Sequence, residues 1–207
     1  MALFITFEGG EGVGKSLQAR MLYQKLLRLG IPALLTYEPG GTPLGKKIAR
    51  LLKWSESSQV SPLAELLLFN ASRAQLVSEV IRPALKEGKT VICDRFSDST
   101  IAYQGYGRGL DLKMVRTIND SATGGLKPDL TVLLNLPVEE GLARKARLQG
   151  NLDRFEQETS DFHRRVRKGY LKLASSEPQR WLVVDAKEPK EKLASIIWRR
   201  VEELLVR

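Results

Sequence analysis

The sequence contains almost no cysteine or histidine. Among its 207 residues, Cys93 is the one cysteine and His163 the one histidine. A single cysteine cannot form an internal disulfide, which is typical of proteins in a reducing compartment, and Cys93 lies in an apolar run where a small buried residue fits. His163 lies in a basic helical pattern, so we interpret it as a surface residue without a functional role.

Long hydrophobic runs are lacking as well. The apolar stretch Ala2 to Phe7 is too short for the core of a signal peptide or for a membrane span, and no charged leader precedes it. We therefore expect a soluble, cytoplasmic protein with no membrane partner. Repeats are also missing, and a chain of 207 residues with 43% hydrophobic residues can bury one core. Residues 1–207 are predicted to form a single domain.

Positive charge is present in excess. The formal net charge is +9, and such an excess favours an acidic partner. Basic residues gather at Arg144 to Arg147 and at Arg164 to Lys172, but helical spacing exposes much of the second group to solvent. We find no nucleic-acid-binding module. We therefore expect small phosphorylated molecules as partners, and no stable complex with nucleic acid.

A glycine-rich segment carries the strongest functional signal. Residues 8–16 read Glu-Gly-Gly-Glu-Gly-Val-Gly-Lys-Ser and contain Gly-x-x-x-x-Gly-Lys-Ser. A loop with so little side-chain bulk can surround phosphate oxygens with backbone N–H groups, while Lys15 adds positive charge and the Ser16 hydroxyl can reach Mg²⁺. An apolar strand precedes the loop and a leucine-rich helical pattern follows it. The predicted phosphate- and ATP-binding loop consists of Gly9, Gly10, Glu11, Gly12, Val13, Gly14, Lys15 and Ser16.

Strand and helix patterns alternate along the whole chain. Strands are predicted at residues 2–7, 33–37, 90–94, 129–136 and 181–184. Helical patterns are predicted at residues 17–29, 46–54, 62–86, 98–104, 111–122, from 137 to the break at Gly150-Asn151, after residues 153–156 with a basic outward face, and at 189–205. This alternation predicts a three-layer α/β fold with a five-stranded parallel sheet flanked by helices.

Loops at the carboxyl ends of parallel strands meet at one edge of a sheet. The loop at residues 38–43 and the acid Asp94, which ends a strand, should therefore lie beside the phosphate-binding loop. In proteins with such loops, an aspartate at this place helps to hold Mg²⁺, although Asp94 could instead cap the next helix. Phe69 and Arg73 share a helix face, and their spacing alone favours a core aromatic with a surface arginine.

A break at Gly150 indicates a mobile lid, approximately residues 144–156. A kinase must exclude water from phosphoryl transfer, and a lid with arginines does so while adding positive charge. Arg144, Arg147 and Arg154 flank the break, whereas the phosphate-binding loop contains no arginine. A solvated basic helix is the alternative. A GTPase is disfavoured because Asn-Lys-x-Asp is absent, and we expect no room for the further domains of an ATPase motor.

Taken in order, the motifs resemble those of the bacterial thymidylate kinase family, whose members have the P-loop NTPase fold. The resemblance covers essentially the whole chain. It implies transfer of a phosphoryl group from ATP to dTMP, giving dTDP and ADP for dTTP synthesis, with Mg²⁺ and in a homodimer. The motifs are residues 8–16, Glu-Pro-Gly-Gly-Thr at 38–42, residues 69–75, Asp-Arg-Phe at 94–96, Ala-Tyr-Gln-Gly-x-Gly-Arg-Gly at 102–109 and Asp-Arg-Phe-Glu at 153–156.

The resemblance also implies roles for the residues that contact dTMP. Phe69 stacks on thymine, and Arg73 donates to its exocyclic oxygen, which favours a buried arginine. Gln104 faces the edge of the base with Thr100 near it, and Tyr103 lies beneath the deoxyribose. The implied substrate-binding residues are Glu11, Glu38, Phe69, Arg73, Arg95, Thr100, Tyr103 and Gln104.

Further roles concern the phosphates. Arg95 holds the acceptor phosphate, Glu11 accepts from the 3′-hydroxyl of dTMP, and Arg144 packs on adenine. Ser16 and Asp94 are the implied metal ligands. The implied catalytic residues are Lys15, Asp94, Arg95, Arg147 and Arg154, of which the last two act as lid cations.

The sequence departs from the family pattern at two positions. Tyr37 stands where an arginine is common, and Leu17 where a second hydroxyl residue is common, so one cationic contact and one contact to ATP phosphates are in doubt. Two other functions stay open. A deoxynucleoside kinase needs a carboxylate base for its sugar hydroxyl, a role open to Glu38. A basic regulatory or RNA-binding protein would bind nucleotide without turnover.

Overall fold

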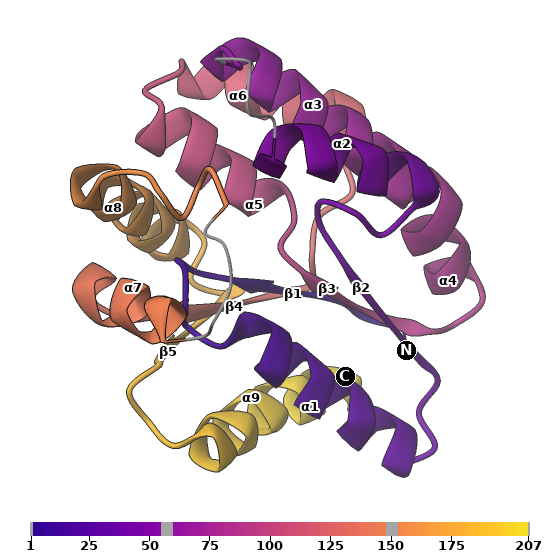
Figure 1. The fold of residues 1–207 in the computed structure, drawn as a ribbon. Helices are drawn as coiled ribbons and strands as arrows, with labels where there is room; N and C mark the ends of the chain where they lie inside the picture. The colour runs from indigo at the N-terminus through magenta and orange to yellow at the C-terminus, as the bar shows by residue number, and fades with distance from the viewer. Residues whose placement is uncertain (1, 55–59, 148–152, 207) are drawn as a thin grey trace.

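The computed structural model describes residues 2–54, 60–147 and 153–206. Its centre is a five-stranded parallel sheet with the order β2-β3-β1-β4-β5, as Figure 1 shows. The strands are β1 (Phe4–Glu8), β2 (Ala33–Tyr37), β3 (Thr90–Asp94), β4 (Leu130–Asn135) and β5 (Trp181–Asp185). Because β1 lies between β3 and β4, the segment that follows β1 emerges near the middle of the sheet.

Helices cover both faces of the sheet (Figure 1). The α-helices are α1 (Lys15–Arg28), α2 (Pro43–Trp54), α3 (Pro62–Leu76), α4 (Arg82–Lys86), α5 (Ser97–Thr100), α6 (Leu112–Thr123), α7 (Val138–Ala146), α8 (Ser160–Ser176) and α9 (Lys190–Leu205), and two π-helical segments are η1 (Val77–Ile81) and η2 (Ile101–Gly107). Helices α1 and α9 lie on one face, and α3, α5 and α8 lie on the other. The three-layer α/β architecture and the five-stranded parallel sheet are confirmed.

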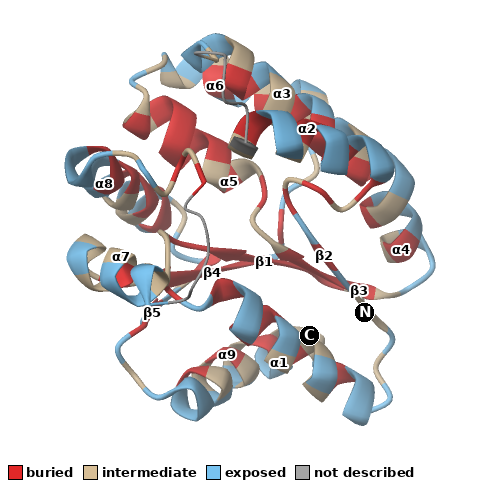
Figure 2. Ribbon diagram, in the orientation of Figure 1, coloured by how far each residue is buried: buried red, intermediate tan, exposed pale blue. Residues whose placement is uncertain are grey.

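The protein has a hydrophobic core on each face of the sheet, because successive side chains of a strand point to opposite faces. Ile5 and Phe7 of β1 pack toward Leu26 of α1 and Ile197 of α9. On the opposite face, Phe4 packs with neighbours from η1 and β3. Figure 2 shows buried residues along the sheet and on the helix sides that face it. The continuous apolar strands therefore support helices on both faces.

Two helix predictions differ from the structure. The predicted helix at residues 62–86 is one helical run, but it contains the π-helical segment η1 between α3 and α4. The helix predicted to end near residue 104 continues to Gly107 as η2, and the predicted loop begins only after it. A Cβ at Gly107 would collide with Phe162 of α8, so this glycine serves close helix packing and not a turn.

Within residues 2–54, 60–147 and 153–206, no helix is both long and apolar enough to cross a bilayer.

Candidate active site

The phosphate-binding loop joins the end of β1 to the start of α1. Gly9, Gly12 and Gly14 have φ values of 138°, 67° and 93°, a region that favours glycine. The Lys15 amine donates to the carbonyl of Gly10 at 2.6 Å. Burial, together with the nearby Arg95 guanidinium, lowers the pKa of Lys15 to about 8. The loop thus presents backbone amides and one amine at the start of a helix.

The loop also touches helix α7 at a point where two glycines meet. A Cβ at Gly12 would collide with the carbonyl oxygen of Gly141, and a Cβ at Gly141 would collide with the carbonyl oxygen of Glu11. Only residues without a side chain permit this approach. The backbone of α7 therefore supports the loop directly.

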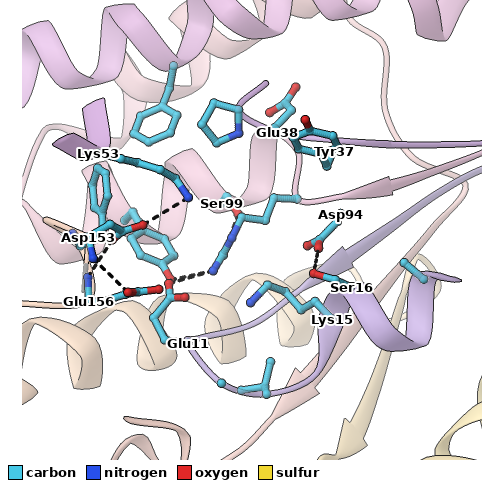
Figure 3. Close-up of a pocket in the computed structure, with 18 of the residues that line it drawn as sticks. Glu11, Lys15, Ser16, Tyr37, Glu38, Lys53, Asp94, Ser99, Asp153 and Glu156 are labelled. Atoms are coloured by element: carbon cyan, nitrogen blue, oxygen red, sulfur yellow. Dashed lines mark hydrogen bonds and ion pairs between the residues drawn. The ribbon is translucent and has the colours of Figure 1, made fainter. Parts of the chain in front are cut away.

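Ser16 and Asp94 meet at the end of the loop, as predicted. The Ser16 hydroxyl donates to the Asp94 carboxylate, and the two side chains point toward one another beside Lys15 in Figure 3. Both offer hard oxygen ligands, the kind that Mg²⁺ prefers when phosphates and water complete its coordination. Within the described ranges, no cluster of three or more His, Cys, Asp or Glu side chains could hold a metal. The pair therefore fits a cation shared with bound phosphates.

Arg95 lies at the centre of the pocket and has a positive φ of 71°, which is unusual for a residue with a side chain. Its guanidinium donates to Glu11 at 2.9 Å, to the Tyr103 hydroxyl at 3.2 Å and to the Gly9 carbonyl at 3.0 Å. Tyr103 also donates to Glu11 at 2.6 Å. Burial would raise the pKa of Glu11, but Arg95 and Lys15 outweigh it and lower the pKa to about 2.

Glu8, the last residue of β1, supports this cluster and was not assigned a role from the sequence. Its carboxylate accepts from the Phe96 amide at 2.8 Å, the Ser99 hydroxyl at 2.6 Å and the Tyr170 hydroxyl at 2.8 Å. Burial raises the pKa of Glu8 to about 7, with a smaller contribution from Asp98. The sequence places Glu8 at the end of an apolar strand next to the phosphate-binding loop, but it does not show which groups contact this carboxylate.

Arg73 is buried, so the surface arginine favoured by spacing alone is wrong. Its side chain is 1% exposed and forms a double contact with Glu38, at 2.9 and 2.7 Å. It also donates to Thr100 at 2.6 Å and to Asn119 at 2.9 Å. All three guanidinium nitrogens thus have acceptors within the protein. The half-buried Phe69 lies on the same helix and lines the pocket.

A second buried carboxylate, Glu65, lies near the start of α3. It accepts from Gln104 at 2.7 Å, from Arg108 at 3.1 Å and from Arg154 at 2.7 Å. Glu65 is fully buried. The sequence showed an acid in an apolar helical pattern, which is a signal for a buried ion pair, but its partners come from segments far along the chain.

These groups surround one large pocket. Its volume is about 640 Å³, within the range of about 300–1,000 Å³ that is usual for small-molecule sites. The predicted site residues that line it are Glu11, Gly12, Val13, Gly14, Lys15, Ser16, Glu38, Phe69, Arg73, Asp94, Arg95, Thr100, Tyr103 and Gln104. Further lining residues that the sequence reasoning did not assign include Lys53, Ser99, Lys145, Asp153 and Glu156, labelled in part in Figure 3.

Gly9, Gly10 and the predicted lid arginines lie elsewhere. The two glycines border a small hollow behind the loop. Arg144 donates to the carbonyl of Ala186 at 2.9 Å, Arg147 is exposed after α7, and Arg154 is held by Glu65. The lid predicted at residues 144–156 includes residues 148–152, which lie outside the described residues. The arginine roles therefore stay predictions.

Three remaining expectations can be compared with the structure. His163 is 4% exposed, so its interpretation as a surface residue is wrong. It lies on the inner side of α8, where burial lowers its pKa. Tyr37 and Leu17, the two departures from the family pattern, are exposed side chains that line the pocket. Both therefore stand where a substrate contact could be altered.

Comparison with known proteins gives consistent matches. The family model described as thymidylate kinase matches residues 7–197. A thymidylate kinase of Dehalococcoides mccartyi (strain CBDB1) is 55% identical over 205 residues, covering 99% of this chain and 98% of the relative. A thymidylate kinase of Deinococcus radiodurans is 52% identical over 201 residues, with 97% of both chains covered. The crystal structure of thymidylate kinase from Ehrlichia chaffeensis has a TM-score of 0.73 and 35% identity, covering 88% of this chain and 92% of that one.

Proposed function

Because this chain belongs to the thymidylate kinase family, it is an ATP-dependent kinase that converts dTMP to dTDP, and we propose how its pocket performs the transfer. The observation that supports the proposal is a single pocket with two chemically different ends. Lys15 and Ser16 of α1 and Asp94 at the end of β3 line it on the side of the phosphate-binding loop, and Phe69 and Arg73 line it from α3. Such a pocket can hold two nucleotides with their phosphates facing each other.

The dTMP molecule is proposed to occupy the end formed by α3 and η2. The ring of Phe69 offers a face on which thymine can stack, and Thr100 and Gln104 line the wall beside it. The Arg95 guanidinium, already oriented by Glu11 and Tyr103, is proposed to bind the phosphate of dTMP. Glu11 and Tyr103 are then placed to contact the deoxyribose.

The ATP molecule is proposed to place its phosphates in the loop between β1 and α1. Backbone N–H groups of Gly12 to Ser16 and the Lys15 amine hold these phosphates. Ser16 and Asp94 would hold Mg²⁺, which neutralises phosphate charge and keeps the reacting oxygens in place. Arg144, which is tied to Ala186, is proposed to pack on adenine.

No side chain has to remove a proton in this reaction. The attacking oxygen belongs to a phosphomonoester whose second pKa is about 6, so it is largely ionised near neutral pH. The chain's residues therefore have three tasks: to align the two phosphates, to neutralise charge and to exclude water. Alignment alone can supply on the order of 7–11 kcal/mol of the barrier. Arg147 and Arg154 are proposed to add positive charge when substrates are bound.

The contacts of Glu38 argue against a deoxynucleoside kinase. Such an enzyme needs a free carboxylate to accept the proton of a sugar hydroxyl. Here both oxygens of Glu38 are within 3.2 Å of Arg73 nitrogens. Burial raises the pKa of Glu38, but Arg73 already holds both of its oxygens, so Glu38 is not free to accept a proton from a sugar hydroxyl. The pocket therefore suits an acceptor that is already ionised.

A coupled assay of nucleoside diphosphate formation tests the proposed function. Purified protein with Mg²⁺ and ATP is expected to phosphorylate dTMP in strong preference to dCMP, dAMP and dGMP, because the pocket fits one pyrimidine edge. Thymidine is expected to be a poor acceptor. Folded protein that leaves dTMP unchanged, or that prefers thymidine, would contradict the proposal.

We also propose that the chain is one domain that works in the cytoplasm as a homodimer. Adjacent helices α2 and α3 expose four leucines, Leu44, Leu51, Leu63 and Leu67, which are 45–56% exposed. Replacing Leu51 and Leu67 by aspartate should halve the mass measured by analytical ultracentrifugation. Leu27→Asp, on α1, should leave it unchanged. A monomeric wild-type protein would contradict the homodimer.

A further inference from the structure

Glu65 makes contacts that have a consequence for base selection. Its side chain is completely buried and is surrounded by donors from two separate segments, residues 104–108 and Arg154. Arg108 donates through Nε and Nη2, both at 3.1 Å, and Arg154 donates through Nη2 at 2.7 Å. Every one of these partners is a donor nitrogen, so both oxygens of Glu65 act as acceptors.

This acceptor fixes the orientation of the Gln104 amide. The Gln104 atom that lies 2.7 Å from Glu65 must be the NH₂ group, because an amide oxygen there would face a carboxylate oxygen without a proton between them. The amide oxygen is consequently turned away from Glu65. Within the described part of the chain, no side chain or backbone group donates to that oxygen. Gln104 itself lines the substrate pocket.

An amide oxygen and an amide NH₂ select different pyrimidines. Thymine carries a hydrogen on N3 and therefore offers a donor at the middle of its base-pairing edge. Cytosine has a lone pair on N3 and an amino group beside it. A fixed amide oxygen accepts from the thymine N3–H, whereas it faces the cytosine N3 as one acceptor against another. A fixed orientation thus gives discrimination that a freely rotating amide does not give.

We propose that Glu65 is a specificity-determining positioning residue, which holds the Gln104 amide so that its oxygen faces the N3–H of thymine. The inference rests on the proposed function, because it places the base of dTMP beside Gln104. Glu65 does not contact the base in this proposal. It acts through Gln104, and Arg108 holds the Glu65 carboxylate in place through two hydrogen bonds.

The first test compares Glu65→Gln with the wild type. Glutamine has nearly the same shape but can donate as well as accept, so the Gln104 amide can rotate and present its NH₂ group to the base. We expect the ratio of kcat/KM for dTMP to that for dCMP to fall at least about tenfold. The KM for dTMP should rise more than kcat falls, because the change affects base binding and leaves the phosphates in place.

A matched control removes another carboxylate partner of Arg108 and leaves the contact between Glu65 and Gln104 unchanged. Glu158 contacts the other terminal nitrogen of Arg108 at 2.5 Å. Glu158→Gln therefore alters the same ion-pair network while it keeps the carboxylate that faces Gln104. The dTMP/dCMP ratio is expected to stay within about twofold of the wild-type value.

A rescue variant separates positioning from a general loss of structure. In the double variant Glu65→Gln with Gln104→Glu, the amide lies at position 65 and the carboxylate at position 104, where either oxygen accepts from N3–H. On a logarithmic scale, the ratio of kcat/KM for dTMP to that for dCMP should recover at least half of the loss seen in Glu65→Gln. Gln104→Met keeps Glu65 and its arginines, so it should fold, and it should lose discrimination as Glu65→Gln does.

Either of two results would overturn the inference: a folded Glu65→Gln protein with the wild-type ratio, or a folded Gln104→Met protein with the wild-type ratio. If Glu65→Gln does not fold, Gln104→Met and the double variant decide. A wild-type protein that forms no dTDP would instead contradict the proposed function. The same variants would then be compared by calorimetric binding of dTMP and dCMP, where the same ranking is expected.

Discussion

Lys15→Ala should lower the turnover number for dTDP formation by about 10²–10³-fold, the usual cost of removing one group that stabilises developing charge. Lys15 is the only cation between Gly9 and Ser16 in the sequence, and its amine already lies within the loop, 2.6 Å from the carbonyl of Gly10. Alanine leaves the backbone amides of the loop in place but removes the amine that is proposed to neutralise negative charge on the ATP phosphates. The loss should therefore appear mainly in kcat.

Binding of dTMP should change little in the same variant. The groups proposed to hold dTMP, Phe69 and Arg95 among them, have contacts of their own that do not depend on Lys15. Isothermal titration with dTMP and a coupled assay of kcat separate the two effects. Lys25→Ala is the matched control, because Lys25 lies on the same helix α1 and contacts the Trp198 ring. Near-normal turnover of Lys15→Ala would count against the proposed mechanism.

Arg73→Ala should destabilise the fold by about 3–5 kcal/mol, because it leaves the buried carboxylate of Glu38 without its partner. The side chains of Glu38 and Arg73 are 3% and 1% exposed, so water cannot replace the lost contact. Thr100 and Asn119 would lose a donor as well. Denaturant-induced unfolding, followed by circular dichroism, measures this loss.

The same variant should also select thymine less well, since Arg73 holds Thr100 at the base end of the pocket. The loss of stability and the loss of thymine selection can be separated with the double variant Arg73→Met with Glu38→Met. This change removes the unpaired charge and should recover most of the stability. The preference for dTMP over dCMP should stay impaired. A single variant that is as stable as the wild type, or that discriminates as well, would be inconsistent with these roles.

The sequence predicted best what depends on neighbours along the chain. The loop from Gly9 to Ser16 and the position of Asp94 could be predicted because strand, loop and helix follow each other directly, and parallel strands bring their carboxyl ends to one edge. Helical spacing reports which face a side chain occupies but not how deep that face is buried. Arg73 and His163 were therefore misjudged from spacing, although both are almost fully buried.

Contacts between distant segments were out of reach of pattern reasoning. Glu65 and Arg154 are 89 residues apart, and no periodicity connects them. The resemblance to a family supplied the names of site residues such as Gln104, but it did not give the orientation of their polar atoms. That orientation depends on which partner can donate, which only the packed structure shows.

The close approach of Gly12 and Gly141 limits which substitutions the protein can tolerate. Gly141 lies within helix α7, and its lack of a side chain lets the backbone of that helix rest against the phosphate-binding loop. In a library of random mutants screened for dTDP formation, codon 141 should tolerate almost no replacement, even alanine. Such a screen would then identify Gly141 as essential for activity, although it has no side chain with which to contact a nucleotide.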